Sequence, residues 1–192
     1  MTVADVLSSS GYSCRPLDED HYLDDFECGH GGSLADWLRL RAPRFHAEDL
    51  CRVWILSPED RNDKVLGFYT LSGHLVEIGS IARRERYNDR DNGSMIGAMG
   101  RAPAQLLGKF ALDTTCQGKG LSKLLMACSY ATYLAGAEQA GSKYLVVEAR
   151  GARVIEFYES LGFVRSSQVR DGLTSLYRTT TAIRCEMAAI LA

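Results

Sequence analysis

The sequence predicts a mixed α/β fold, with a central sheet covered by helices on both faces. Strand-like and helix-like segments alternate along the chain in the order β-α-β-β-β-α-β-α-β. One segment, Tyr144–Glu148, is an almost continuous apolar run, as expected of a strand covered on both sides. The chain has 192 residues, 46% of them hydrophobic, which suits one full core. We therefore expect a single domain over residues 1–192.

The first half of the chain predicts three strands and one helix. The segment Tyr12–Leu17 is typical of a short strand. Next, a helix with Ser33 as its N-cap places apolar residues at helical spacing, until Pro43 ends or bends it. Two further strands, Cys51–Ser57 and Val65–Ile78, are joined by a polar turn and form a hairpin.

The second half begins with Gly79–Pro103, which has no sustained period and is rich in Gly and Arg, so we expect a long functional loop. A strand at Leu106–Leu112 precedes an amphipathic helix that starts near Leu121. Its predicted apolar face consists of Leu121, Leu124, Leu125, Cys128, Ala131 and Leu134. A short helix then ends at Gly162, placed as a C′ glycine, and a last strand is expected within Ser175–Cys185.

Composition excludes several classes of protein. The net charge of −2 gives no global reason for a nucleic-acid partner, although a local basic patch remains open. The six cysteines form no C-x-x-C pair and the four histidines show no metal-ligand spacing, so we expect no metal site. The N-terminus lacks the pattern of a signal peptide, and no apolar run is long enough to span a bilayer. We expect a cytoplasmic protein with reduced thiols.

The stretch Gln117–Ser122, QGKGLS, lies where the Leu106–Leu112 strand passes into the long helix. A helix N-terminus has unpaired amides and a partial positive charge, and glycines let a phosphate approach it closely. Gly118 and Gly120 suit that role, and Lys119 can add a charge-assisted contact. The nucleotide-binding Walker A pattern fails, because Gly120 follows the lysine. The alternative is a plain helix start with glycine capping.

QGKGLS resembles the Q/R-x-x-G-x-G/A signature of the GNAT acetyltransferases through Gln117, Gly120 and Ser122. Ser122 departs from the usual Gly or Ala at the last position. The resemblance implies the GNAT fold, with acetyl-CoA as cosubstrate. It assigns the pyrophosphate to Gln117, Gly118, Lys119, Gly120, Leu121 and Ser122. It assigns the pantetheine arm to a strand that splays from its neighbour, here Phe110, Ala111 and Leu112.

A second motif, FYESLGF at Phe157–Phe163, resembles the closing helix of the same family, FYxxxGF. The resemblance makes Tyr158 the general acid that protonates the leaving CoA thiolate. The alternative is a tyrosine packed beside Phe157 with a satisfied hydroxyl. No general base stands out, since Asp113 and Glu148 are expected to be structural or solvated.

Two longer stretches, FECGHGGSLADWLRLRA and LGKFALDTTCQGKGLSKLLM, resemble the tRNA-acetylating toxins of type II toxin–antitoxin pairs. That resemblance implies acetylation of the α-amine of aminoacyl-tRNA, a ribbon-helix-helix antitoxin and a homodimer. An α-amine also suits a site without a base. Its pKa of about 7.8 makes neutralisation at pH 7 cost about 1 kcal/mol, against roughly 4.6 kcal/mol for a lysine of pKa about 10.4.

For a tRNA partner we expect basic residues near the acceptor site. Gly79–Phe110 holds six basic and three acidic residues, a local charge of 6 − 3 = +3. The candidates are Arg83, Arg84, Arg86, Arg90 and Arg101, and Tyr87 could stack on a base. The alternative is a solvated charged loop. Two other functions stay open: a GNAT enzyme for a small-molecule or protein amine, marked by an acidic cleft beside the thioester, and a non-catalytic acyl-CoA-binding module.

Overall fold

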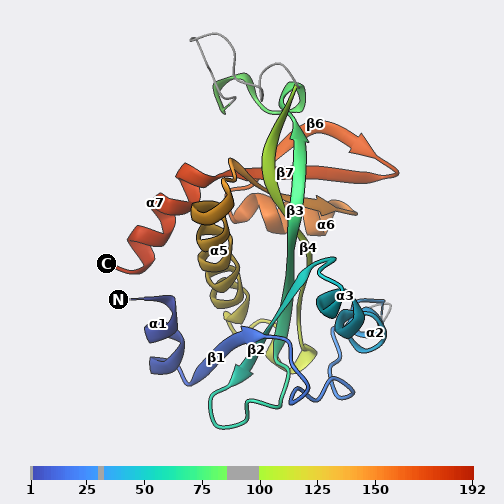
Figure 1. Cartoon of the computed structure of the whole chain (residues 1–192), viewed down its shortest axis with the longest axis vertical. Helices are drawn as coiled ribbons and strands as arrows, with labels where there is room; N and C mark the ends of the chain where they lie inside the picture. Colours follow the sequence, from blue (N-terminus) through green and yellow to red (C-terminus); the bar gives the residue numbers. More distant parts are fainter. Residues whose placement is uncertain (1, 30–32, 86–99) are drawn as a thin grey trace. The chain divides into compact units, whose positions relative to one another are not determined.

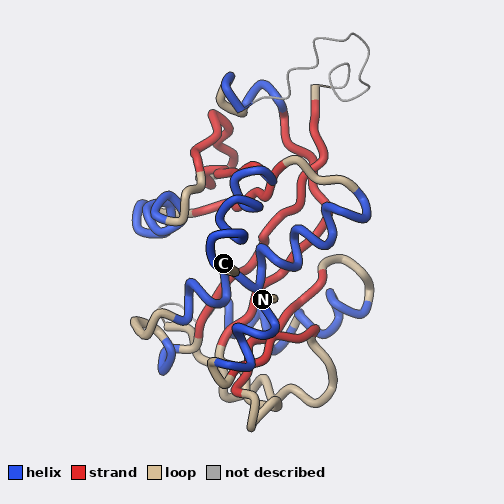
Figure 2. The backbone as a smooth tube through the Cα atoms, turned by 90° about the vertical axis from the view of Figure 1, so that its left-hand side faces the viewer, coloured by secondary structure: helices blue, strands red, loops and turns tan. Residues whose placement is uncertain are grey.

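The structure is a computed structural model that describes residues 2–29, 33–85 and 100–192. Its strands are β1 (Tyr12–Pro16), β2 (Arg52–Pro58), β3 (Gly67–Glu77), β4 (Arg101–Leu112), β5 (Tyr144–Ala149), β6 (Val164–Arg170) and β7 (Leu173–Thr179). Its α-helices are α1 (Val3–Ser9), α2 (Ser33–Leu40), α3 (Ala42–Ala47), α5 (Leu121–Ala140), α6 (Ala152–Ser160) and α7 (Thr180–Ile190). Three 3₁₀ turns complete the described elements: η1 (Ile78–Ser80), η2 (Arg83–Glu85) and η3 (Thr114–Cys116). Figure 2 shows these helices in blue and strands in red.

The seven strands form one sheet in the order β1-β2-β3-β4-β5-β7-β6 (Figure 1). The pairs β1–β2, β2–β3, β5–β7 and β6–β7 are antiparallel, whereas β4 and β5 are parallel. A mixed, mostly antiparallel sheet with helices confirms the predicted fold class.

The chain packs as two compact units. The first comprises Met1–Ser72, Gly108–Thr132 and Met187–Ala192, and the second comprises Gly73–Leu107 and Tyr133–Glu186. The prediction of a single domain stays a prediction. None of the helices in the described ranges is both long and apolar enough to cross a membrane.

The first unit has a core built around aromatic side chains. Phe26 meets Phe68 edge-on with ring centroids 5.5 Å apart, and Trp37 stacks on Phe68 at 6.0 Å. Leu38 of α2 and Ala42 of α3 are fully buried in the same cluster. The two helices lie side by side, as Figure 1 shows. Pro43 lies at the start of α3, so the sequence correctly placed a helix break there.

The second unit has its own core, centred on two tyrosines. Tyr144 of β5 and Tyr177 of β7 are fully buried, together with Val76, Val146 and Ile81. The two tyrosine rings meet at an interplanar angle of 86°, the edge-to-face geometry that aromatic quadrupoles favour.

Several predicted boundaries were wrong. The strand expected at Leu106–Leu112 begins at Arg101, so Arg101–Pro103 belongs to β4 and not to a loop. The strand expected within Ser175–Cys185 ends at Thr179. There the Oγ1 atom of Thr179 accepts a hydrogen bond from the Ala182 N–H at 3.2 Å, which caps α7 and starts a helix.

The predicted order of strands and helices left out α1, β6 and α7, which the structure contains. The amphipathic reading of α5 was also incomplete, because six consecutive residues, 125–130, are buried. This middle part of α5 is buried all round and carries no single apolar face, whereas Lys123 and the last residues of the helix are exposed.

Candidate active site

The turn between β4 and α5 holds the predicted phosphate-binding residues. Gly118 has a φ of +74° and Gly120 a φ of +83°, a backbone region that side chains with a Cβ rarely occupy. A Cβ placed at either glycine would meet no atom within 4 Å. Glycine is therefore required here by backbone conformation and not by crowding, and the space in front of the turn is open.

This open turn leads directly into the N-terminus of α5. Lys119 is exposed, while Leu121 and Ser122 are half-buried in the first turn of the helix. Among the first amides, the Lys123 N–H reaches back to the Gly120 carbonyl at 3.1 Å. A helix of 20 residues that begins at an accessible glycine turn has the features of an anion-binding site.

The side chain of Gln117 makes two hydrogen bonds within the protein, and its predicted contact with a pyrophosphate stays a prediction. Its side-chain amide donates to the Leu112 carbonyl at 3.1 Å and to the Cys28 carbonyl at 3.2 Å. Gln117 thereby ties the end of β4 and the segment around Cys28 to the glycine turn. In this geometry the residue supports the turn through backbone contacts.

Asp113, one of the two acids near strand ends, supports the same turn. Its carboxylate accepts hydrogen bonds from the Glu27 N–H at 3.0 Å, the Thr115 N–H at 2.9 Å and the Thr115 hydroxyl. Burial on its own raises the pKa of Asp113, but these hydrogen bonds and the charge of Lys64 outweigh it and lower the pKa overall. An acid held ionised as a cap is a poor candidate for a general base.

The strand that precedes the turn is closely packed against β3. Ala111 and Leu112 are buried and Phe110 is half-buried. A Cβ at Gly67 would lie 2.6 Å from Leu112 Cδ2 and 3.0 Å from the Ala111 carbonyl, so only glycine fits opposite this segment. The register of β4 with β5 runs from Ala104↔Tyr144 to Leu106↔Val146, and both strands continue further. The predicted splaying of the strand at Phe110–Leu112 from its neighbour stays a prediction.

Tyr158 lies in the last turn of α6, where the FYESLGF stretch forms a helix stop. The Gly162 N–H donates to the Glu159 carbonyl at 2.9 Å, and the Phe163 N–H donates to the Tyr158 carbonyl at 3.1 Å. Gly162 has a φ of +80°. These two bonds form a Schellman motif, which confirms Gly162 as a C′ glycine.

The same motif fixes the ring of Tyr158. The ring contacts Phe163 at 5.4 Å and Phe157 at 5.2 Å between centroids, both edge-on. Tyr158 is 8% exposed. Tyr158 is therefore packed beside Phe157, as the alternative to a catalytic role requires. Packing also holds the ring in one orientation, which a proton donor needs, so the catalytic role stays a proposal.

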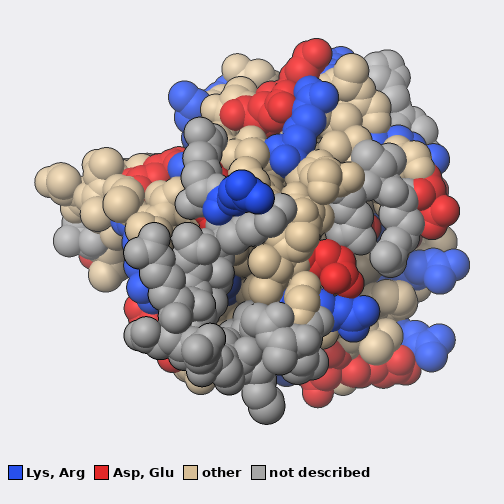
Figure 3. Space-filling model, turned by 90° about the horizontal axis from the view of Figure 1, so that it is seen from above, with Lys and Arg blue, Asp and Glu red and all other residues tan. Residues whose placement is uncertain are grey.

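The basic candidates fall on both sides of the segment 86–99. Arg83 is exposed in η2, and Arg101 begins β4 with its Nε 3.0 Å from Glu77 Oε1. The side chain of Arg84, and Arg86, Tyr87 and Arg90 as a whole, lie outside the described residues. On the face shown in Figure 3, basic and acidic side chains are interspersed.

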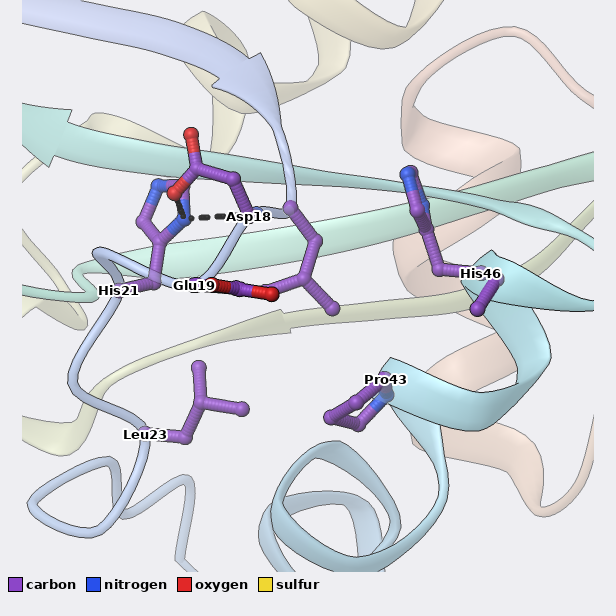
Figure 4. Close-up of a pocket in the computed structure, with 8 residues that line it drawn as sticks. Asp18, Glu19, His21, Leu23, Pro43 and His46 are labelled. Carbon is purple, nitrogen blue, oxygen red and sulfur yellow. Dashed lines mark hydrogen bonds and ion pairs between the residues drawn. The ribbon is translucent and has the colours of Figure 1, made fainter.

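A cavity of about 430 Å³ in the first unit contains acidic side chains (Figure 4). Pro43 and His46 of α3 lie across from His21 and Leu23, and Asp18 and Glu19 supply carboxylates. Asp18 is already paired with Arg15 and with His21. Burial and the Arg15 charge lower the pKa of His21, although Asp18 opposes them. None of the predicted coenzyme-binding residues lines this cavity, so the small-amine alternative, which requires an acidic cleft beside the thioester, stays open.

Comparisons with known proteins place this fold. The chain is 28% identical over 155 residues to the tRNA-acetylating toxin of Mycobacterium tuberculosis, which covers 80% of this chain and 86% of the toxin. AtaT complexed with acetyl-methionyl-tRNA is 26% identical, with a TM-score of 0.77 over 91% of this chain and 98% of that one.

A second solved structure is a tyrosine-to-phenylalanine mutant of AtaT bound to the C-terminus of the antitoxin AtaR and to acetyl-CoA. It is 25% identical, with a TM-score of 0.71 over 92% of this chain and 98% of that one. No family model matches the chain. The fold is that of the GNAT toxins, as the resemblance to the acetyltransferase signature implied.

Proposed function

We propose that the chain is an acetyl-CoA-dependent N-acetyltransferase, a toxin that acetylates the α-amine of aminoacyl-tRNA and so blocks translation. The observation that carries the proposal is the open turn just before α5, in which Gly118 and Gly120 both have positive φ. The relative from Mycobacterium tuberculosis is a tRNA-acetylating toxin, and solved relatives include complexes with acetyl-CoA and with acetyl-methionyl-tRNA.

The residues of the turn fit a diphosphate. Backbone amides near Gly118 and Gly120 and the partial charge of the helix N-terminus favour an anion, and the exposed Lys119 adds a full charge. Ser122, although not Gly or Ala, is small and carries a hydroxyl that can serve as a donor. Phe110, Ala111 and Leu112 offer backbone groups to the pantetheine arm, and Gln117 acts by holding the turn.

The acceptor nitrogen attacks as a neutral amine. An α-amine is neutral in an appreciable fraction of molecules at pH 7, so water can take the proton that the nitrogen loses. This agrees with the position of Asp113, whose carboxylate is engaged in three hydrogen bonds to protein groups.

The bond that breaks joins the acetyl carbon to sulfur, and the departing thiolate needs a proton. Tyr158 donates it in this proposal, because phenol and thiol differ little enough in pKa for the transfer to be efficient. The aromatic contacts of Tyr158 with Phe157 and Phe163 keep its orientation constant during the reaction.

The proposal extends to the partners. Arg83 and Arg101 contact tRNA phosphates, with Arg84, Arg86 and Arg90 as further candidates. A ribbon-helix-helix antitoxin, a homodimer and a cytoplasmic location complete it. The solved structure of AtaT with the C-terminus of the antitoxin AtaR supports an antitoxin partner.

The proposal is tested with Tyr158→Phe, which removes only the hydroxyl. Turnover should fall by about 10²-fold or more, while acetyl-CoA affinity measured by calorimetry stays unchanged. Transfer is measured with radiolabelled acetyl-CoA on a charged-tRNA pool and on a panel of small amines. A variant at full rate removes Tyr158 from the mechanism. Label on small amines alone favours the other acetyltransferase reading. Label on neither, with acetyl-CoA still bound, leaves the non-catalytic acyl-CoA-binding module.

A further inference from the structure

Two buried tyrosines in the second unit reach the same short segment of backbone. Tyr144 of β5 and Tyr177 of β7 are on neighbouring strands, in the register Val146↔Tyr177 and Tyr144↔Thr179. Neither is exposed, and their rings are 5.7 Å apart. Both hydroxyls extend from this core to the segment Ala82–Glu85.

The hydrogen bonds to this segment are complementary. The Tyr144 hydroxyl donates to the Glu85 carbonyl at 2.9 Å, and the Ala82 N–H donates to the Tyr177 hydroxyl at 3.0 Å. The Glu85 carboxylate also interacts with the Tyr177 hydroxyl. Burial, followed by this contact with Glu85, raises the pKa of Tyr177 to about 12. One tyrosine therefore holds the start of the segment and the other holds its end.

An apolar contact fixes the same segment from the N-terminal side. Ile81 is 1% exposed and belongs to the cluster that contains both tyrosines. Ile81 directly follows η1, whose first N–H, that of Ile78, donates to the Gly100 carbonyl at 3.0 Å. The two chain segments that flank residues 86–99 are thus joined by a backbone hydrogen bond and packed on one core.

The two chain segments that flank residues 86–99 carry basic side chains. Arg83 is exposed in η2, between the two positions that the tyrosines hold, and the exposed Arg101 immediately follows Gly100. The Arg101–Glu77 pair is about half exposed on both sides, so solvent screens it and a phosphate can compete for the guanidinium. An arginine on an immobilised backbone loses less conformational entropy when it binds a phosphate.

We infer that Tyr144 and Tyr177 are positioning residues for a nucleic-acid contact made by Arg83 and Arg101. The inference rests on the proposed function, because the phosphates it requires are those of tRNA. The tyrosine hydroxyls touch neither substrate. They act by holding Ala82–Glu85, and therefore Arg83, in one place.

The test removes single hydroxyls with Tyr177→Phe and, separately, Tyr144→Phe. Binding of a total tRNA pool is measured by filter retention, and acetyl transfer to charged tRNA gives KM and kcat. We expect tRNA affinity to fall about 3- to 10-fold and the KM for tRNA to rise equally. The KM for acetyl-CoA should not change.

Tyr133→Phe is the matched control in the same unit. Its buried hydroxyl is 2.6 Å from Thr180 Oγ1, away from Ala82–Glu85 in the hydrogen-bond pattern. A fall in Tm similar to that of the other two variants is expected, with tRNA affinity unchanged. If Tyr133→Phe weakens tRNA binding as much as Tyr177→Phe and Tyr144→Phe, the effect is general destabilisation and the inference is overturned.

Arginine variants separate this inference from the proposed function. Arg83→Ala combined with Arg101→Ala should weaken tRNA binding, and adding Tyr177→Phe to that background should produce no further loss. If the arginine variants bind less tRNA but both Tyr→Phe variants bind normally, the positioning role is wrong. If the arginine variants bind normally while acetyl transfer to tRNA persists, the contact is wrong and the enzymatic proposal survives. Absence of transfer by the wild-type protein removes the proposed function itself.

Discussion

Replacing Gly162 with alanine tests how the helix stop supports Tyr158. Gly162 has a φ of +80°, and an added Cβ would lie 3.2 Å from Arg178 Nη2 and 3.3 Å from its Cζ. The left-handed conformation costs an L-residue about 1–2 kcal/mol. The side chain of Arg178 is only 11% exposed and is paired with Glu186, so the guanidinium cannot move aside freely.

These two effects give a loss of about 2 kcal/mol in unfolding free energy for Gly162→Ala. For a chain of 192 residues, that corresponds to a fall in Tm of roughly 4–8 °C. The strain also acts on the two hydrogen bonds that end α6. A small displacement of the Tyr158 ring should lower kcat about tenfold, with the KM for acetyl-CoA unchanged.

Gly141→Ala is the matched control. Gly141 has a φ of +74° and donates to the Ala137 carbonyl at 3.0 Å, but a Cβ there meets nothing within 4 Å. The unfolding free energy of this variant should fall only by the cost of the left-handed backbone conformation, about 1 kcal/mol, and its kcat should not change. Thermal unfolding and steady-state kinetics of both variants decide the matter. Equal losses of stability, together with an unchanged kcat for Gly162→Ala, would refute the argument that the motif positions Tyr158.

Two further predictions concern the turn. Gly120→Ala should raise the KM for acetyl-CoA about tenfold with little change in kcat, because the proposed pyrophosphate site needs the positive φ of this residue. Coenzyme titration checks this prediction, and an unchanged KM contradicts it. Asp113→Asn should destabilise the protein by about 1–3 kcal/mol at pH 7, since a charged cap is lost. The folded pKa of Asp113 is lowered, so its contribution is present above the unfolded value near 3.8 and is lost as the pH falls through the folded pKa. Urea unfolding at pH 7 and pH 3 should show the difference between wild type and variant shrinking at low pH, and an equal difference at both pH values would show that the carboxylate charge is irrelevant.

Local patterns predicted those parts of the fold that depend on neighbouring residues. The glycine at position 162 and the break at Pro43 were readable because backbone conformation limits which residues can occupy such positions. The capping box of α1, in which Thr2 and Asp5 exchange hydrogen bonds, is also visible in the sequence, but the sequence analysis did not predict this helix.

The missed elements depended on distant parts of the chain. β6 is polar, with the sequence VRSSQVR, and is a strand because β7 pairs with it across an irregular register. The start of α7 lies in a run of threonines, a residue type that favours strands. The chain nevertheless forms a helix there, because the Thr179 side chain caps its first turn.

The candidate site shows the same division. The glycines of the turn could be predicted from sequence, because their role is local. The position of Gln117 could not, since one of its partners is the carbonyl of Cys28, 89 residues away. The tyrosines that hold Ala82–Glu85 come from strands more than fifty residues later and carry no motif that marks them.

The most direct test of the account compares charged and deacylated tRNA as acceptors of labelled acetyl from acetyl-CoA. The account predicts label only on charged tRNA, released by mild alkali as an N-acetyl amino acid. Label on deacylated tRNA, or label on small amines with none on charged tRNA, would contradict the claim that the acceptor is the α-amine of an aminoacyl-tRNA.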